Sequence, residues 1–165
     1  MSDLSFVISA ETEVERYAID TLNERAFGPG RFARSAYRLR EGTKSERMFS
    51  YVAYVGTLLV GANQMSPIKC GSKPALLLGP LAVEPAFRSR GIGEALVRVS
   101  LESAQAAGHE LAILVGDESY YGRMGFKRVP PGRLSLPGPV DPGRLLYCEL
   151  TPGAFAGVSG VVTPL

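Results

Sequence analysis

Apolar residues are spaced along this chain in two ways, every three to four positions in some stretches and in short unbroken runs in others. The first spacing is typical of amphipathic helices and the second of buried strands. These patterns predict a short strand at residues 4–8 and a helix that begins after Ser9 and Thr12 and ends near the glycine-proline segment 28–30. A second, shorter helix is predicted over residues 31–40.

The middle of the chain has the pattern of a sheet. Residues 48–55 and 57–65 are rich in β-prone side chains and are separated by Gly56, which predicts a hairpin. A loop is expected at residues 67–74. The run 76–83 then begins with three consecutive leucines, so we expect a central strand that is covered on both faces.

Gly79 and Pro80 interrupt this central strand. Proline has no N–H to donate to a neighbouring strand, so a bulge or a splaying of the sheet is expected at this point. A helix is predicted over residues 91–107, ended by Gly108, followed by an apolar strand at 111–115. Strand, helix and strand in this order form a right-handed crossover between parallel strands.

Shorter elements fill the C-terminal third of the chain. A brief helix is predicted at residues 117–124, with strands at 126–129 and 145–150 on either side of a proline- and glycine-rich stretch. The small, apolar tail after Thr151 has no clear pattern. All elements fit one domain, residues 1–165, of the α+β class with a mixed sheet.

Composition narrows the classes of protein. The 165 residues are 45% hydrophobic and 21% charged with a net charge of +2, which is ordinary for a globular domain and gives no reason to expect a nucleic-acid partner. No segment approaches the roughly 18 uninterrupted apolar residues of a membrane span. Without a leader pattern at the N-terminus, we expect a cytoplasmic protein that is not membrane-bound. Cys70 and Cys148 lack metal-ligand spacing, so free thiols and no metal site are expected.

The segment before the predicted helix 91–107 has the chemistry of a phosphate site. Arg88, Gly91 and Gly93 follow an R-x-x-G-x-G spacing, in which glycines allow a close turn and the first helical N–H groups face an anion. A dinucleotide site is excluded because Leu96 stands where a third glycine is required, and a P-loop because no G-K-[ST] follows. Two interpretations remain at this point, a site for a nucleotide-bearing ligand or an exposed loop that caps a helix.

Flanking residues decide between them. Residues 81–97, LAVEPAFRSRGIGEALV, closely resemble the coenzyme A motif of the GNAT family, the GCN5-related N-acetyltransferases. Residues 121–126, YGRMGF, resemble the Y-x-x-x-G-F signature of the same family and follow the next strand, as expected there. Residues 115–121, VGDESYY, resemble a bacterial subgroup of predicted acetyltransferases. The resemblance covers roughly residues 48–129.

The resemblance implies an enzyme that moves an acetyl group from acetyl-CoA to a primary amine of a small-molecule or peptide acceptor, by direct attack. It implies a mixed, mostly antiparallel central sheet that is splayed between two parallel strands, with helices on both faces. The implied cofactor-binding residues are Leu81, Ala82 and Val83 for the pantetheine arm, and Arg88, Ser89, Arg90, Gly91, Ile92, Gly93 and Glu94 for the pyrophosphate.

The resemblance also implies chemical roles. Tyr121 matches the tyrosine that lies by the coenzyme sulfur and protonates the leaving thiolate, and its alternative interpretation is a core aromatic that only contacts the cofactor. The backbone N–H near Leu81 is the candidate for polarising the thioester carbonyl. Neither cysteine lies at a family motif position, which argues against a covalent acetyl-enzyme.

No motif fixes the base that accepts a proton from the amine. Glu84 and Asp117 follow the ends of the two splayed strands, and we select Glu84 as the candidate. Glu84 can instead simply begin the loop, Asp117 can cap a helix, and a chain of waters can carry the proton. His109, the single histidine, is expected to be structural.

The sequence leaves alternatives for the function, the acyl donor, the acceptor and the oligomeric state. A non-catalytic module that binds acyl-CoA is the alternative function, and a longer acyl-CoA is an alternative donor. Arg31, Arg34 and Arg38 slightly favour an acceptor that carries an anionic group. The apolar last strand and tail, residues 145–165, offer a surface for a second copy of the chain, so a homodimer is one expectation.

Overall fold

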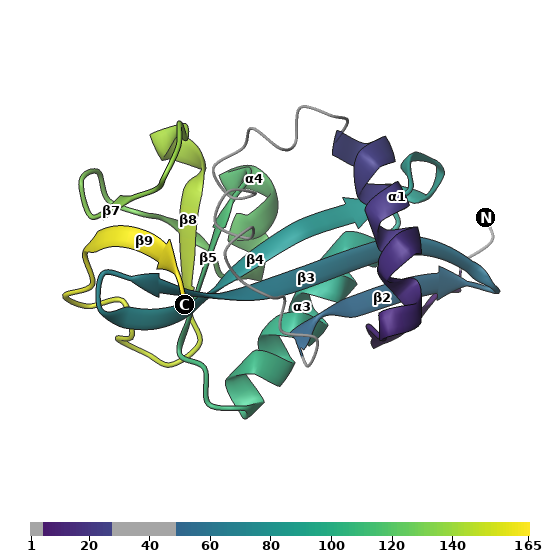
Figure 1. The fold of residues 1–165 in the computed structure, drawn as a ribbon, viewed down its shortest axis with the longest axis horizontal. Helices are drawn as coiled ribbons and strands as arrows, with labels where there is room; N and C mark the ends of the chain where they lie inside the picture. Colours follow the sequence, from purple (N-terminus) through teal and green to yellow (C-terminus); the bar gives the residue numbers. More distant parts are fainter. Residues whose placement is uncertain (1–4, 28–48) are drawn as a thin grey trace.

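The computed structural model describes residues 5–27 and 49–165, which form one sheet of nine strands with helices on either side (Figure 1). Neighbouring strands follow the order β1-β2-β3-β4-β5-β8-β6, and β9 pairs with both β3 and β7. The β4–β5 and β7–β9 pairs are parallel and the others are antiparallel, which confirms the predicted mixed sheet. The strands are β1 (Val7–Ala10), β2 (Tyr51–Val55), β3 (Leu58–Cys70), β4 (Lys73–Val83), β5 (Leu111–Val115), β6 (Lys127–Arg128), β7 (Leu134–Ser135), β8 (Leu145–Glu149) and β9 (Gly160–Pro164).

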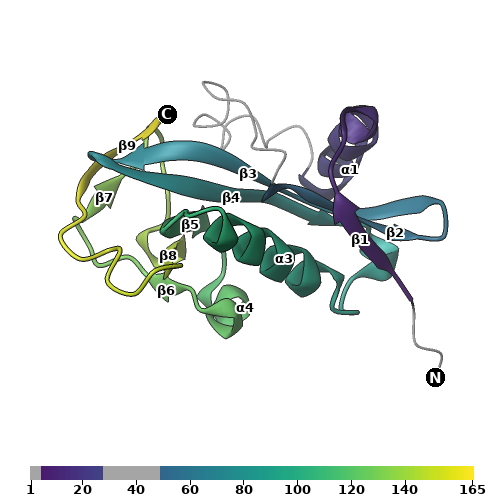
Figure 2. The same ribbon diagram turned by 90° about the horizontal axis from the view of Figure 1, so that it is seen from below.

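Helices cover both faces of the sheet. Figure 2 shows α1 (Arg16–Phe27) on one face, with α3 (Ile92–Ala106) and α4 (Glu118–Tyr121) on the opposite face. This arrangement confirms the helices predicted at both faces, whereas the helix predicted over residues 31–40 lies outside the described residues. Short 3-10 turns are found at Glu13–Glu15, Pro85–Phe87, Gly122–Met124 and Pro142–Arg144.

The three consecutive leucines of β4 bring two faces of the core together. Leu76 and Leu78 pack with Leu101 of α3, whereas Leu77 packs with Ile68 and other residues on the opposite face. Each of the three leucines is at most 4% exposed. Burying such a side chain contributes roughly 1.5–3 kcal/mol. The strand β4 is therefore covered on both faces, as the sequence predicted for a central strand.

The segment before α1 explains where that helix begins. The Glu15 carboxylate accepts hydrogen bonds from the Thr12 backbone N–H at 2.7 Å and from the Thr12 hydroxyl at 3.0 Å. These bonds stabilise the first turn, which has no helical acceptor for its own N–H groups. The helix then buries Ile19 and Leu22 against Ala82 of β4, as its apolar spacing predicted.

The loop predicted at residues 67–74 is wrong, because β3 and β4 continue through this segment and meet at a tight turn that contains Gly71. The two prolines that suggested a loop are both paired within the hairpin, Pro67 opposite Leu76 and Pro74 opposite Lys69. On its other side β4 joins β5 only at Leu76 and Leu77, so no second ladder needs an N–H from Pro74. A proline is tolerated in a strand at such a position.

The C-terminal tail, which the sequence left unplaced, adds β9 to β3 of the same chain. Cys70 of β3 lies opposite Val162 of β9. Arg133 holds the preceding segment by donating hydrogen bonds to the carbonyls of Val158 at 2.7 Å and Phe155 at 2.8 Å. The tail therefore pairs within its own chain, while Val161 and Leu165 stay exposed.

Candidate functional site

The two parallel strands separate soon after they pair. The β4–β5 ladder consists of Leu76 opposite Ala112 and Leu77 opposite Ile113. Beyond this point, among the strands of the described ranges, β4 continues to Val83 while paired only with β3, and β5 is paired only with β8. The sheet therefore opens between the two strands, and the edge of β4 that faces this gap has backbone groups without a partner strand. This confirms the predicted splaying.

A bulge lies where β4 enters the gap. Met65 of β3 is opposite Leu78 and Asn63 is opposite Leu81, so β4 has one more residue than β3 across the same interval. The extra residue falls at the Gly79-Pro80 peptide, which is cis, and Gly79 has a φ of 115°. Only glycine adopts such a backbone readily. The bulge that the sequence predicted here is confirmed.

Beyond the bulge, the three residues predicted for the pantetheine arm lie on this unpaired edge. Leu81 and Val83 direct their half-buried side chains toward α3, and the side chain of Ala82 packs on the opposite face against α1. With both faces covered by the two helices, the free groups of this segment lie on its edge. An extended ligand can add there as another strand.

The loop from β4 to α3 brings the predicted phosphate-binding residues to one end of the gap. Arg88 donates from Nε to the carbonyl of Val83 at 3.3 Å, so its exposed guanidinium lies beside the end of β4. Ser89 has a φ of 63° and Gly91 has a φ of 84°. These left-handed residues turn the chain sharply into α3.

The first turn of α3 has free backbone donors. Its first helical hydrogen bond runs from the Ala95 N–H to the Gly91 carbonyl at 3.0 Å. Within the described residues, the N–H groups of Ile92, Gly93 and Glu94 have no backbone acceptor. Together with the helix dipole, these donors favour an anion at this end of the helix.

Tyr121 lies at the end of β5, across the gap from β4. Its ring packs so closely on Gly116 that a Cβ there would be 2.5 Å from Cε2, and it meets the Phe126 ring edge-on at 5.9 Å. Burial raises the pKa of Tyr121 above its usual value, so the phenol keeps its proton at neutral pH. Among the described residues, no group forms a hydrogen bond with its hydroxyl, which leaves that hydroxyl available as a donor.

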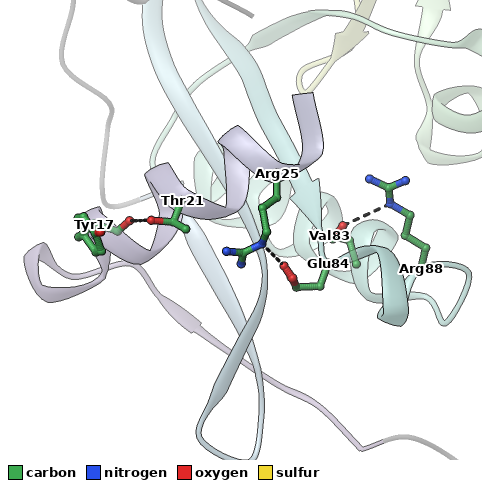
Figure 3. Close-up of polar contacts among 6 residues, drawn as sticks. All are labelled: Tyr17, Thr21, Arg25, Val83, Glu84 and Arg88. Atoms are coloured by element: carbon green, nitrogen blue, oxygen red, sulfur yellow. Dashed lines mark hydrogen bonds and ion pairs between the residues drawn. The ribbon is translucent and has the colours of Figure 1, made fainter. Parts of the chain in front are cut away.

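Glu84 forms an ion pair that the sequence did not reveal. Figure 3 shows Arg25 of α1 directed at Glu84, with its Nε 2.6 Å from Glu84 Oε1, while Arg88 lies near the adjoining Val83. The Glu84 side chain is 17% exposed and that of Arg25 is 51% exposed. Because 59 positions separate the two residues, no local pattern could have predicted their contact.

Other candidates for catalysis have structural contacts. Asp117 Oδ1 lies 3.2 Å from Arg144 Nε, and His109 meets the Phe49 ring edge-on at 4.9 Å. Cys70 and Cys148 are both buried free thiols, and burial raises the pKa of the Cys70 thiol to about 11. Across residues 5–27 and 49–165, no group of three or more histidine, cysteine, aspartate or glutamate side chains could hold a metal ion. In the same ranges no helix is long and apolar enough to cross a membrane.

Comparisons with known proteins agree with this geometry. A family model described as an acetyltransferase (GNAT) domain matches residues 46–128. The uncharacterized N-acetyltransferase YhbS of Escherichia coli strain K12 is 26% identical over 162 residues, which is 94% of either chain. The crystal structure of YhbS in complex with CoA superposes with a TM-score of 0.82 at 25% identity, covering 100% of this chain and 92% of that one. A GNAT family acetyltransferase from Brucella melitensis in complex with acetyl-CoA has a TM-score of 0.71 at 24% identity, covering 98% and 97%.

Proposed function

Because the chain belongs to the GNAT family of N-acetyltransferases, we propose that it transfers the acetyl group of acetyl-CoA to a primary amine in a ternary complex. One observation carries this proposal: the unpaired edge of β4 leads directly to the free N–H groups of α3. This places a strand edge for an extended arm beside a donor-rich site for phosphates. Acetyl-CoA contains both parts in that order. YhbS, which is similar along nearly its whole length, was crystallised with CoA.

In this proposal the pantetheine arm pairs with Leu81, Ala82 and Val83 as an added strand. The thioester then lies by the bulge, where the backbone N–H near Leu81 polarises its carbonyl. An N–H that points at a developing oxyanion can lower the barrier by about 2.7–4 kcal/mol. The pyrophosphate lies at the start of α3, held by Arg88, Ser89, Arg90, Gly91, Ile92, Gly93 and Glu94.

The chemical step follows from these positions. The neutral amine attacks the thioester carbon, and the C–S bond breaks as the tetrahedral intermediate collapses to an amide. The leaving thiolate takes a proton from the Tyr121 hydroxyl, and the amine nitrogen loses a proton to a base. The Tyr121 phenol is protonated at neutral pH and can make this donation, while its raised pKa makes it a weaker acid than an exposed phenol.

A base must accept the proton that the amine nitrogen loses. Glu84 remains our candidate, since it directly follows β4, three residues beyond Leu81. Its carboxylate already binds Arg25, and that of Asp117 already binds Arg144. Both carboxylates therefore have a structural task, and a water chain can take the proton instead.

Several predictions for the whole chain remain predictions: a single domain over residues 1–165, a cytoplasmic location, a homodimer, and a small-molecule or peptide amine as acceptor. Arg31, Arg34 and Arg38, which favoured an acceptor with an anionic group, lie outside the described residues.

The experiment is release of free CoA thiol from acetyl-CoA over a panel of polyamines, amino acids, aminoglycosides and lysine peptides, read with a thiol reagent. Both protein cysteines are buried, so the reagent reports CoA. We expect amine-dependent release with at least one class. Binding of acetyl-CoA without release over the whole panel would instead favour a non-catalytic acyl-CoA-binding module.

A further inference from the structure

Tyr120, which lies in the stretch that resembles the bacterial subgroup but has no role assigned to it, reaches from α4 to the first turn of α3. An ideal Cβ built on Gly93 would lie 2.5 Å from Tyr120 Oη and 3.7 Å from Leu81 Cδ2 and Val83 Cγ2. The Tyr120 hydroxyl therefore lies against the Gly93 backbone, on the side that faces the Leu81 and Val83 side chains of β4. The neighbouring Tyr121 contacts Gly116 at the end of β5 instead.

This contact explains why residue 93 is a glycine. Its backbone does not have the positive φ that favours glycine at position 91. The space that a side chain would need is filled by the Tyr120 hydroxyl. Gly93 thus allows Tyr120 to come close to the helical N–H groups that we propose as donors to the pyrophosphate.

The Tyr120 hydroxyl is free to bind a ligand. Within the described chain it forms no hydrogen bond, and the residue is only half-buried. The ring is held by its neighbours, with the Tyr121 ring edge-on at 4.9 Å and the Arg123 guanidinium 5.2 Å from its centroid. Burial raises the pKa of Tyr120, the Arg123 guanidinium opposes this rise and the Glu94 carboxylate adds to it, so the phenol stays protonated as a donor at neutral pH.

We propose that Tyr120 is a coenzyme A-binding residue whose hydroxyl donates a hydrogen bond to the phosphate held at the first turn of α3. The two adjacent tyrosines then contact different parts of the cofactor: Tyr120 binds the phosphate, and Tyr121 lies by the sulfur and protonates it. This inference rests on the proposed function, because it takes the CoA site at the start of α3 as given.

Truncated ligands separate these two ends. CoA and 4′-phosphopantetheine both carry the phosphate next to the pantetheine arm, and pantetheine has the arm and thiol alone. We expect Tyr120→Phe to raise the Kd of CoA and of 4′-phosphopantetheine about tenfold, the usual effect of losing a hydrogen bond to a charged group. The Kd of pantetheine should stay as in the wild type.

Two further variants serve as controls. Tyr147→Phe removes a hydroxyl from a ring that stacks on Phe155 in the other core cluster, so all three Kd values should match the wild type. Tyr121→Phe should lower kcat, and any change that it causes in Kd should be the same for pantetheine and 4′-phosphopantetheine, because both ligands carry the thiol. Thermal unfolding of each phenylalanine variant confirms that it is folded.

The outcomes are distinct. An unchanged Kd of CoA in Tyr120→Phe, with normal binding by the wild type, overturns this inference alone. An equal loss for pantetheine and 4′-phosphopantetheine also overturns it, since the contact would then be to the arm. A wild-type protein that binds none of the three ligands overturns the proposed function, and this inference with it.

Discussion

Replacing Gly93 by alanine tests the contact between α3 and α4 directly. The added Cβ would lie 2.5 Å from Tyr120 Oη, a distance that real Cβ atoms essentially never show. The other two neighbours, Leu81 Cδ2 and Val83 Cγ2, would be 3.7 Å away in ordinary van der Waals contact. The strain therefore falls on one side chain, Tyr120, which must move or push the first turn of α3 away.

The magnitude follows from two opposing effects. Overpacking of this kind costs about 1–3 kcal/mol. Alanine in place of glycine favours a helix by up to about 1 kcal/mol. Gly93→Ala alone should therefore leave the free energy of unfolding unchanged or lower it by up to roughly 3 kcal/mol. In a Tyr120→Phe background the clashing oxygen is gone, so the same exchange should stabilise the protein.

Urea unfolding of the wild type, both single variants and the double variant measures this coupling. We expect a coupling energy of about 1–3 kcal/mol, well above the roughly 0.5 kcal/mol scatter of independent sites. Gly122→Ala with Tyr120→Phe is the matched control, because a Cβ at Gly122 meets nothing within 4 Å. If the Gly93 cycle is as additive as the Gly122 cycle, the contact that we describe between Tyr120 and Gly93 does not exist.

Three further predictions follow from contacts elsewhere. Tyr121→Phe should lower kcat by about 10²–10⁴. Burial raises the pKa of Tyr121 in the folded state, so the wild type should lose stability as the pH rises above about 10, the pKa of an unfolded tyrosine. Urea unfolding at each pH should show a steeper loss for the wild type than for the variant. Glu84→Gln and Arg25→Gln should each cost less than about 1 kcal/mol of stability, because each breaks the same partly exposed pair. If Glu84 is the base, kcat should fall in Glu84→Gln but not in Arg25→Gln, and equal kcat in the two variants would exclude it. Gly71→Ala should destabilise the fold by about 1–3 kcal/mol more than Gly56→Ala in urea unfolding. Both glycines have a positive φ, but only at Gly71 would a Cβ clash with a backbone carbonyl, that of Ser159 just before β9. Equal effects would mean that the segment before β9 moves aside without cost.

The parts of the fold that depend on local chemistry were predictable from the sequence. The periodicity of α3, its end at Gly108 and the bulge at Gly79-Pro80 each follow from a few neighbouring residues. The parallel pairing of β4 and β5 followed from the order of strand, helix and strand. In each case the physical signal lies within one stretch of chain.

Contacts between distant segments were not predictable. Pro67 and Pro74 indicated a loop because proline has no N–H to donate to a neighbouring strand. Only the completed sheet shows that no donor is needed at these positions. The ion pair of Arg25 with Glu84 depends on how α1 crosses β4. Tyr120 and Tyr121 are adjacent and chemically identical, and only the rotation of α4 directs one hydroxyl to α3.

The short ladder between β4 and β5 also makes the opening in the sheet a weak joint of the molecule. Only Leu76 and Leu77 of β4 are paired with β5, so the two halves of the sheet are held together largely by side-chain packing, against α3 on one face and within the cluster around Leu77 on the other. A ligand that adds as a strand in this opening would supply the missing backbone bonds and join the halves. Amide hydrogen exchange along Leu81–Val83 should then slow far more on binding than exchange in β2, which is already paired on both sides. In that sense the cofactor would act as a removable strand of the fold.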